Sequence, residues 1–459
     1  MSFPKYPAYR DSGIEWLGEV PAHWKEKPFF SLVSERCESN AGMKNENLLS
    51  LSYGRIVNKD INSLDGLLPA SFETYQVVHP GDIVFRLTDL QNDKRSLRSA
   101  IVRDTGIITS AYLAVACRGI FPEFANFLFR AYDSIKVFYS MGGGLRQSMK
   151  YSDMKWLPIL LPDWQEQTHI ARFLDHEIAR IDALIEEQQR LIELLKEKRQ
   201  AVISRAVTKG LDPTVPMKDS GVEWLGEVPA HWDVVRVKHI KSWRPNAFVD
   251  GPFGSNLKSE HFVDDGDVYV IESSFATTGE LNFGDLKQVT LEHFETIKRS
   301  EVCAGDIVIA KIGARYGMCS ILPWLDKPAV VSGNSLKLTV NERICDPKFA
   351  VLVLQHLKER GAIEDIVNMT AQPALSLGEM NNLPFPLPSL GEQLDIVSEL
   401  EKELGEFEAL TSECKQVMNL AIERRSALIS AAVTGKIDVR GWQPPVSTQA
   451  PKFEVAEAN

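Results

Sequence analysis

One phrase of fourteen residues occurs twice in this sequence and constrains the fold more than any other feature. It reads DSGIEWLGEVPAHW at Asp11–Trp24 and DSGVEWLGEVPAHW at Asp219–Trp232, and the only difference is Ile14 against Val222. Chance does not repeat a phrase of this length that includes two Trp and a Pro. The chain therefore carries a duplication or needs the same surface twice, and its fold must provide two equivalent places for the phrase.

A second, longer repeat lies at 161–212 and 387–438, where the two segments align without a gap at an offset of 226 residues. Both segments begin with Leu-Pro, continue with Glu-Gln and contain Ala-Val-Thr near their ends. Repeats of this size indicate duplicated domains rather than a solenoid. We therefore divide the chain into a constant N-terminal phrase that packs near the end of the second helix (1–24), a first variable domain (25–162), a first helix (163–208), the repeated phrase (209–232), a second variable domain (233–388), a second helix (389–434) and a tail (435–459).

Within the longer repeat, residues recur at alternating spacings of four and three, which is the heptad seam of a coiled coil. The apolar seam residues are Leu174, Ile178, Ile181, Ile185, Ile192, Leu195 and Val202 in the first helix, and Leu400, Leu404, Phe407, Met418 and Leu428 in the second. Polar residues at Gln188, Arg199 and Arg425 would fix the register. Two equivalent halves related by a two-fold axis place the helices antiparallel. The alternative is two amphipathic helices, each in its own core.

The predicted fold class is α+β: two α/β domains joined by two long antiparallel coiled-coil helices, with internal pseudo-two-fold symmetry. GDIV at 81–84 and 305–308 begins a predicted strand in each variable domain, and helices are predicted near 124–140 and 348–365. In the repeated phrase we expect apolar residues to pack each variable domain onto the helices, although a docking surface for a partner is the alternative. These residues are Trp16, Leu17, Val20 and Trp24, with Trp224, Leu225, Val228 and Trp232 as their counterparts.

The net charge of −11 argues at first against nucleic acid binding, because nucleic-acid binders are usually basic. The charge is unevenly distributed, however. Residues 25–162 hold 17 Lys+Arg and 14 Asp+Glu, a balance of +3, whereas residues 233–388 hold 16 and 20, a balance of −4. The helices 163–208 and 389–434 carry −2 and −5. This distribution is compatible with DNA binding and does not demonstrate it.

Candidate DNA contacts lie where cationic, amide and aromatic residues follow the predicted strands. Arg and Lys suit guanine edges or phosphate, and Gln suits adenine. A solvated surface position is the alternative for each single residue. The candidates are Arg86, Lys94, Arg95, Arg98, Arg146, Gln147 and Lys150 in the first variable domain, and Ser255, Asn256, Lys258, Lys311, Arg315, Tyr316 and Gln372 in the second.

The sequence lacks the motifs of the common catalytic sites. It contains no GxxxxGK[ST] loop, no GxGxxG after a strand and no Asn/Asp-Pro-Pro-aromatic motif. None of the six cysteines forms a CxxC or lies near His at zinc spacing, so we expect no metal and no disulfide. No apolar run is long enough for a membrane span, and the N-terminus has no signal-peptide pattern. We expect a non-catalytic, cytoplasmic protein.

The whole arrangement resembles the specificity subunit of type I restriction–modification systems. The resemblance rests on the paired EWLGEVPAHW phrases, on the Leu-Pro and Glu-Gln of the helix starts, and on ISRAVTKG and ISAAVTGK at the helix ends. GPFGS and GDIVIAKIG in the second variable domain also look like that family, whereas the first variable domain has no GPFGS counterpart. The resemblance covers nearly the whole chain before the tail.

The resemblance implies a function in DNA recognition. Each variable domain would be a target-recognition domain that reads one half of a bipartite site in double-stranded DNA, and the helices would set the spacer. Partners would be methyltransferase subunits, two in number, and restriction/translocase subunits. S-adenosylmethionine, ATP and Mg would be bound by those partners and no cofactor by this chain. Two other classes stay open: a bifunctional methyltransferase, and a coiled-coil scaffold that binds proteins.

Overall fold

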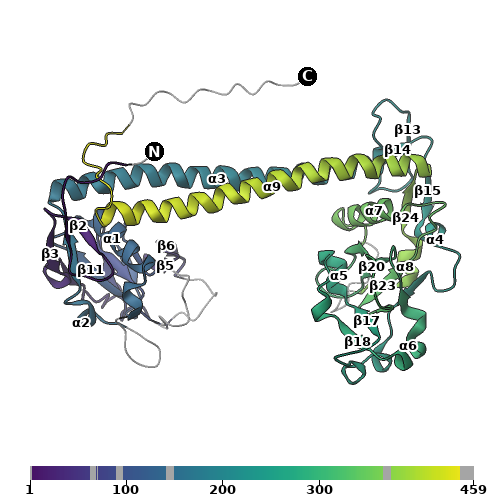
Figure 1. The fold of residues 1–459 in the computed structure, drawn as a ribbon, viewed down its shortest axis with the longest axis horizontal. Coiled ribbons are helices and arrows are strands. Elements are labelled where there is room, and N and C mark those ends of the chain that lie inside the picture. The colour runs from purple at the N-terminus through teal and green to yellow at the C-terminus, as the bar shows by residue number, and fades with distance from the viewer. Residues whose placement is uncertain are drawn as a thin grey trace. The chain divides into compact units, whose positions relative to one another are not determined.

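The structure is a computed structural model that describes residues 3–61, 69, 71–88, 97–140, 149–364 and 374–444. The chain divides into two compact units, Met1–Arg190 with Cys414–Asn459, and Leu191–Glu413. Each unit contains one variable domain, one copy of the repeated phrase and part of both long helices (Figure 1). Within the described residues, no helix has the length and apolarity that crossing a membrane requires.

The first unit contains two four-stranded sheets, with strand orders β6-β5-β10-β7 and β4-β11-β8-β9. Their bounds are β4 (Val33–Glu35), β5 (Leu48–Ser52), β6 (Arg55–Lys59), β7 (Gln76–Val78), β8 (Ile83–Phe85), β9 (Ser99–Ile101), β10 (Gly106–Ile108) and β11 (Leu113–Cys117). Alternate residues of β8 serve different cores, because side chains of a strand point to opposite faces. Ile83 and Phe85 join the core that includes α1 (Pro122–Ser134), whereas Val84 joins a smaller cluster between the sheets.

The second unit repeats this topology, with strand orders β18-β17-β22-β19 and β16-β23-β20-β21. The bounds are β16 (Phe248–Asp250), β17 (Val268–Ile271), β18 (Lys287–Val289), β19 (Glu301–Val302), β20 (Ile307–Ala310), β21 (Cys319–Ile321), β22 (Ala329–Val331) and β23 (Ser335–Leu338). β20 corresponds to β8, and α7 (Pro347–Glu359) corresponds to α1. The parallel pair also recurs, as β5 with β10 and β17 with β22. Sequences that share little therefore form the same strand order.

The repeated phrase forms the same antiparallel hairpin in each unit, β1 (Tyr9–Asp11) with β2 (Glu19–Pro21), and β13 (Met217–Asp219) with β14 (Glu227–Pro229). Leu17, Val20, Trp24 and their counterparts Leu225, Val228 and Trp232 are buried, and Trp16 and Trp224 are half-buried, which confirms the predicted packing role. A two-stranded sheet then closes each variable domain. These sheets are β3 (Lys25–Pro28) with β12 (Pro158–Leu161), and β15 (Asp233–Arg236) with β24 (Pro384–Leu387).

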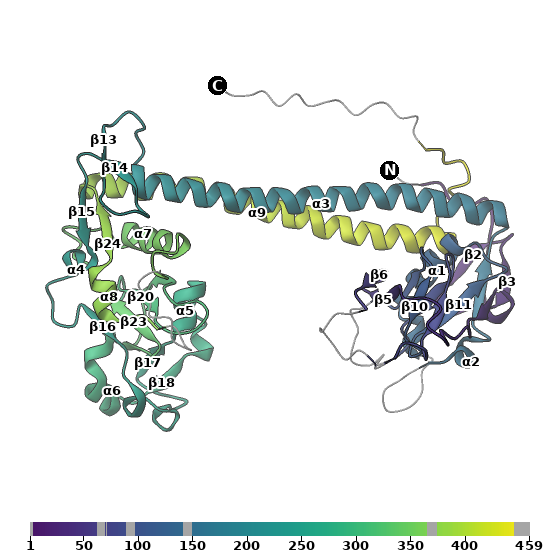
Figure 2. The ribbon, with the colours of Figure 1, turned by 180° about the vertical axis from the view of Figure 1, so that it is seen from behind.

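The two long helices are α3 (Trp164–Lys209) and α9 (Leu390–Val433), within two residues of the predicted bounds. In the first unit, Ile178 and Ile181 of α3 share a core with Ala421 and Leu428 of α9, and Asp182 pairs with Arg425 at 3.2 Å. In the second unit, Ile203 and Ala206 share a core with Val397 and Leu400. The early part of α3 thus packs against the late part of α9, and the late part of α3 packs against the early part of α9. The helices are therefore antiparallel where they pack in each unit (Figure 2).

The predicted seam residues have little exposed surface. All of them are buried or half-buried, and so are Gln188, Arg199 and Arg425 between them. Many positions outside the seam are charged and exposed, for example at 186–187 and 196–198, although some apolar residues such as Leu191 and Leu194 are exposed as well. An amphipathic face of this width requires a packing partner, and each helix supplies it to the other within a unit.

Candidate nucleic-acid interface

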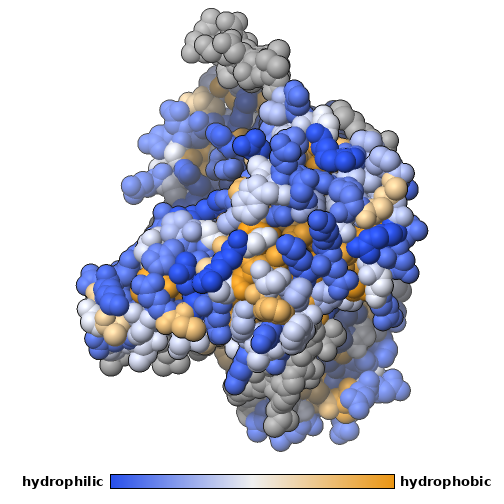
Figure 3. Space-filling view, turned by 90° about the vertical axis from the view of Figure 1, so that its left-hand side faces the viewer, coloured by the Kyte–Doolittle hydropathy of each residue, from blue (hydrophilic) through white to orange (hydrophobic). Residues whose placement is uncertain are grey.

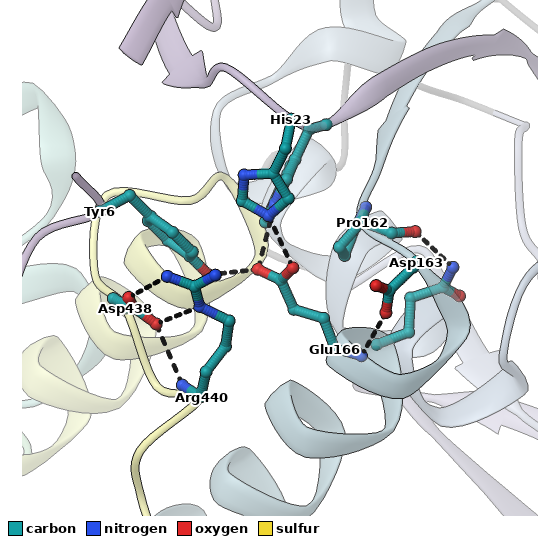
Figure 4. A network of polar contacts seen from close by, with 9 residues as sticks. Tyr6, His23, Pro162, Asp163, Glu166, Asp438 and Arg440 are labelled. Carbon is teal, nitrogen blue, oxygen red and sulfur yellow. Dashed lines mark hydrogen bonds and ion pairs between the residues drawn. The ribbon is translucent and has the colours of Figure 1, made fainter. Parts of the chain in front are cut away.

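A buried carboxylate joins the repeated phrase of the first unit to the start of α3. Glu166 Oε1 accepts hydrogen bonds from Tyr6 Oη (2.6 Å) and Trp24 Nε1 (3.1 Å), and Glu166 Oε2 lies 2.7 Å from His23 Nε2 (Figure 4). Glu166 is only 5% exposed. A buried charge is tolerated when several donors surround it, so this cluster fixes the hairpin against the helix.

The next residue, Gln167, connects the same helix to the variable domain. Its side-chain amide donates to Pro162 O (3.0 Å), and its Oε1 accepts from Phe121 N (2.9 Å), directly before α1. A cavity of about 460 Å³ lies beside this joint and is lined by Lys25, Lys27 and Trp164, among others. Figure 3 views the first unit from this end, where hydrophilic residues cover most of the face and apolar surface lies between them.

The second unit builds the same joint from the second copies of these residues. Glu392 accepts from Trp232 Nε1 (2.9 Å) and lies 3.0 Å from His231 Nε2. Gln393 donates to Pro388 O and to Ile344 O, both at 2.9 Å, and accepts from Asp346 N at the start of α7. The shared Glu-Gln pair therefore has two tasks: Glu holds the hairpin, and Gln holds the variable domain.

The first joint also gathers both ends of the described chain. Asp438 N donates to Pro4 O (2.8 Å), and Tyr9 Oη donates to Gly435 O (3.1 Å). Arg440 pairs with Asp438 at 2.7 Å and lies over the ring of Tyr6. The hydrogen bond from Arg440 lowers the pKa of Asp438, while burial and the bond to Glu166 raise the pKa of Tyr6. The constant N-terminal phrase thus lies against the end of α9.

The described ends of two candidate loops of the first unit lie next to each other. Arg86 follows β8 and Arg98 precedes β9, so the residues between them, which include Lys94 and Arg95, connect two paired strands. Met149 N donates to Leu87 O (2.9 Å), so Met149 lies beside the same strand end. Lys94, Arg95, Arg146 and Gln147 themselves lie outside the described residues.

The second unit has the equivalent backbone hydrogen bond between two loop ends, and we call this contact a crossing in both units. Leu375 N donates to Lys311 O (3.0 Å), and Lys311 follows β20 as Leu87 follows β8. Gln372 lies outside the described residues, just before this contact. Both units therefore place a residue that follows the GDIV strand beside a residue that precedes the short helix α2 (Tyr151–Met154) or α8 (Leu377–Asn382). No direct signal for this shared hydrogen bond is visible in the sequence.

In the second unit the loop 251–258 joins the same site. Lys311 Nζ lies 3.3 Å from Asp250 Oδ2 and 4.0 Å from the ring centroid of Phe253, which is exposed. Gly251 packs so closely on the chain that a Cβ there would lie 1.9 Å from Ser332 O. Glycine is required where backbones approach this closely, so GPFGS is partly a packing motif.

The remaining candidates differ in exposure. Lys150, Asn256, Lys258 and Arg315 are exposed, Arg86 is half-buried, and the side chain of Ser255 is not described. Tyr316 is half-buried, with Lys358 Nζ 3.8 Å from its ring centroid. Lys311 is buried, at 8% exposure. Because no DNA is bound, the exposure of these residues does not test whether they contact DNA, and the contacts stay predictions.

Arg98 departs from the expected surface position. It is 0% exposed, and its Nη1 donates to Thr88 O (2.6 Å) while its backbone N–H donates to Asp133. A guanidinium held by backbone oxygens at a strand connection supports the loop from inside. A basic residue beside a strand has the same sequence pattern whether its side chain points into the domain or into solvent. The sequence therefore could not predict that Arg98 is buried.

The part of the chain that the structure describes shows no group of three or more His, Cys, Asp or Glu placed to hold a metal ion. Each of the six cysteines is a free thiol. Burial raises the pKa of Cys117 to about 12, so this thiol is protonated at neutral pH.

Comparisons with known proteins find similar sequences in one family. The model of the type I restriction modification DNA specificity domain matches residues 254–417. The specificity subunit of type I restriction enzyme MjaVIII from Methanocaldococcus jannaschii is 24% identical over 62% of this chain and 63% of its own length. The EcoBI specificity subunit from Escherichia coli is 23% identical over 62% of this chain and 59% of its own. The match thus spans less than two thirds of either relative.

Two solved structures share the fold. The HsdS subunit from Thermoanaerobacter tengcongensis aligns with a TM-score of 0.52 at 15% identity, covering 91% of this chain and 98% of that subunit. A chain from work on complex assembly and conformational transition of the type I R-M system aligns with a TM-score of 0.68 at 14% identity, covering 90% and 98%.

Proposed function

We propose that the chain is a specificity subunit of a type I restriction–modification system and that it reads a bipartite DNA site for partner subunits that methylate and cut. In this proposal the chain is a DNA-specificity subunit and not an enzyme, in line with the relatives that it matches. Each variable domain is proposed to be a target-recognition domain for one half-site. The observation that carries the proposal is the equivalent pair of loop crossings, Leu87 with Met149 and Lys311 with Leu375.

The two loop clusters suit different half-sites. Their shared strand order and shared crossing present variable loops on one scaffold, which is how loops usually carry function. The exposed cationic and amide residues in them, such as Lys150, Asn256 and Arg315, have the chemistry for phosphate and base-edge contacts. Because the loop sequences differ, the two domains are proposed to read different bases.

The long helices are proposed to form an antiparallel coiled coil that sets the spacer and relates the two halves by a pseudo-two-fold axis. α3 has 46 residues, so its length is roughly 69 Å at about 1.5 Å per residue. Half-sites on one face of a duplex lie roughly 34–36 Å apart, or a multiple of that distance. The continuous seam supports a stiff connection, because a register slip would place Gln188, Arg199 and Arg425 against apolar residues.

The partners are proposed to be two methyltransferase subunits and the restriction/translocase subunits, acting on double-stranded DNA in the cytoplasm. S-adenosylmethionine, ATP and Mg are assigned to those subunits. A methyltransferase extrudes its target adenine from the duplex before reaction. This chain would hold the duplex in register for that step.

The proposal is tested by measuring DNA retention and methyl transfer with purified components. The chain assembled with its methyltransferase subunits should retain duplexes that carry both half-sites and release duplexes with either half altered. The isolated chain should transfer no radiolabelled methyl group. Transfer by the chain alone would favour a bifunctional methyltransferase, and retention without sequence preference would favour a protein-binding scaffold.

A further inference from the structure

Two stacked histidines hold the loop 251–258 of the second unit. The ring centroids of His261 and His293 are 4.0 Å apart, and the ring planes are inclined by 27°. His261 ends η4 (Ser259–His261), directly after the loop, and His293 lies in α6 (Leu291–Ile297). The pair therefore connects the loop to a helix that packs on the sheet of β17 and β18.

Each ring makes one hydrogen bond to the backbone of the loop. Lys258 N–H donates to His261 Nδ1 (3.0 Å), and His293 Nε2 donates to Asn256 O (2.9 Å). A ring nitrogen accepts only when it carries no proton, so Nδ1 of His261 is the acceptor. His293 Nε2 is the donor, because a carbonyl oxygen cannot donate. Both rings therefore hold the backbone of the loop through specific ring atoms.

The charges around the pair oppose each other. Glu260 Oε1 lies 3.8 Å from His261 Nε2 and favours a positive ring, but it also lies 3.5 Å from Lys258 Nζ. A proton on His261 Nδ1 would remove the acceptor for Lys258 N–H and place a cation against the ring of His293. The anchor of α6 is separate, since Asp267 Oδ2 accepts from Leu291 N and Thr290 caps the helix.

We propose that His261 and His293 are positioning residues for DNA recognition by the second variable domain. They place Asn256 and Lys258, both exposed, at the loop cluster where Lys311 contacts Phe253. The inference rests on the proposed function and deepens it. It assigns the two rings no contact with DNA; they act by fixing the loop backbone that carries the contacts.

The test uses paired substitutions in the chain assembled with its methyltransferase subunits. Leucine at either position removes the hydrogen bond. Asn in His261→Asn keeps an acceptor near the place of Nδ1, and Gln in His293→Gln keeps a donor near the place of Nε2. The measured quantity is the ratio of dissociation constants for cognate DNA and for DNA altered in one half-site, for each half in turn, at pH 7.5.

His261→Leu and His293→Leu should each lower discrimination at one half-site by roughly 5- to 150-fold, the range for one lost specific base contact, and leave the other half-site unchanged. His261→Asn and His293→Gln should retain discrimination at pH 7.5.

The possible outcomes distinguish a failure of the positioning role from a failure of the proposed DNA-recognition function. A wild-type complex without any sequence preference overturns the proposed function. A selective wild type with Leu variants that match it at both half-sites overturns only the positioning role. Equal losses at both half-sites, or Asn and Gln variants as impaired as the Leu variants, also overturn it, because both results indicate general destabilisation.

Discussion

The two carboxylate joints predict unequal costs for the same substitution. Glu166→Ala removes the acceptor of two buried donors, Tyr6 Oη and Trp24 Nε1, whose residues are 4% and 2% exposed. An unsatisfied buried donor costs about 1–3 kcal/mol, so the hairpin of the first unit should lose about 2–6 kcal/mol. The side chain of His23 is 43% exposed and can bond to water instead, so it adds little.

The matched control is Glu392→Ala in the second unit. There only Trp232 is a buried donor, because the side chain of His231 is 51% exposed. The expected cost is about 1–3 kcal/mol, roughly half that of the first joint. Glu166→Gln should cost much less than Glu166→Ala, since Tyr6 and Trp24 both donate to Oε1, which the amide oxygen replaces.

Hydrogen–deuterium exchange measures each hairpin separately. Peptides that cover 9–24 and 217–232 report the free energy of local opening in the same sample. Glu166→Ala should lower protection in the first peptide by more than Glu392→Ala lowers it in the second. Equal losses at the two hairpins, or a Gln variant as damaging as the Ala variant, would show that the hydrogen-bond count does not set the strength of the joint.

Three further predictions concern the second unit and the helices. Gly251→Ala should displace the loop 251–258, because its Cβ would lie 1.9 Å from Ser332 O, and DNA-binding assays should show weaker recognition of one half-site only. Burial lowers the pKa of His356 to about 4, so below pH 6.5 the unfolded chain takes up a proton that the folded unit does not. The free energy of unfolding should therefore fall by about 3 kcal/mol between pH 6.5 and 4, and urea titrations of His356→Gln should show a shallower dependence on pH. Four residues added after Gln188 and after Cys414 should lengthen the DNA spacer by about one to two base pairs at unchanged half-sites, since four helical residues add roughly 6 Å, and methylome sequencing that finds altered half-sites with the old spacer contradicts this.

The sequence predicted the long helices well because their physics is local. A spacing of four and three residues fixes which face is apolar, and the bounds of α3 and α9 followed to within two residues. The repeated phrase was equally informative, since Trp24 and Trp232 are apolar residues that a duplicated joint buries. Because the phrase occurs twice in one chain, its two copies could be compared with each other, and the residues that they share indicated the packing positions.

The variable domains were less predictable because their contacts join distant segments. The residues near Met149 do not indicate that its N–H donates to Leu87 O, and those near Leu375 do not indicate that its N–H donates to Lys311 O. Arg98 shows the same difficulty for a single side chain, since the strand pattern does not say which way a connecting residue points. The roles of Glu166 and Gln167 were missed for a related reason: their shared position was visible, but their partners at Tyr6 and Phe121 are 160 and 46 residues away.

Methylome sequencing of a host in which residues 25–160 of this chain are exchanged for the corresponding domain of another specificity subunit tests the central claim most directly. The account predicts that one half of the methylated site changes, while the other half and the spacer stay as they were. A change in both halves, or an unchanged site, would contradict a division of recognition between two separate domains.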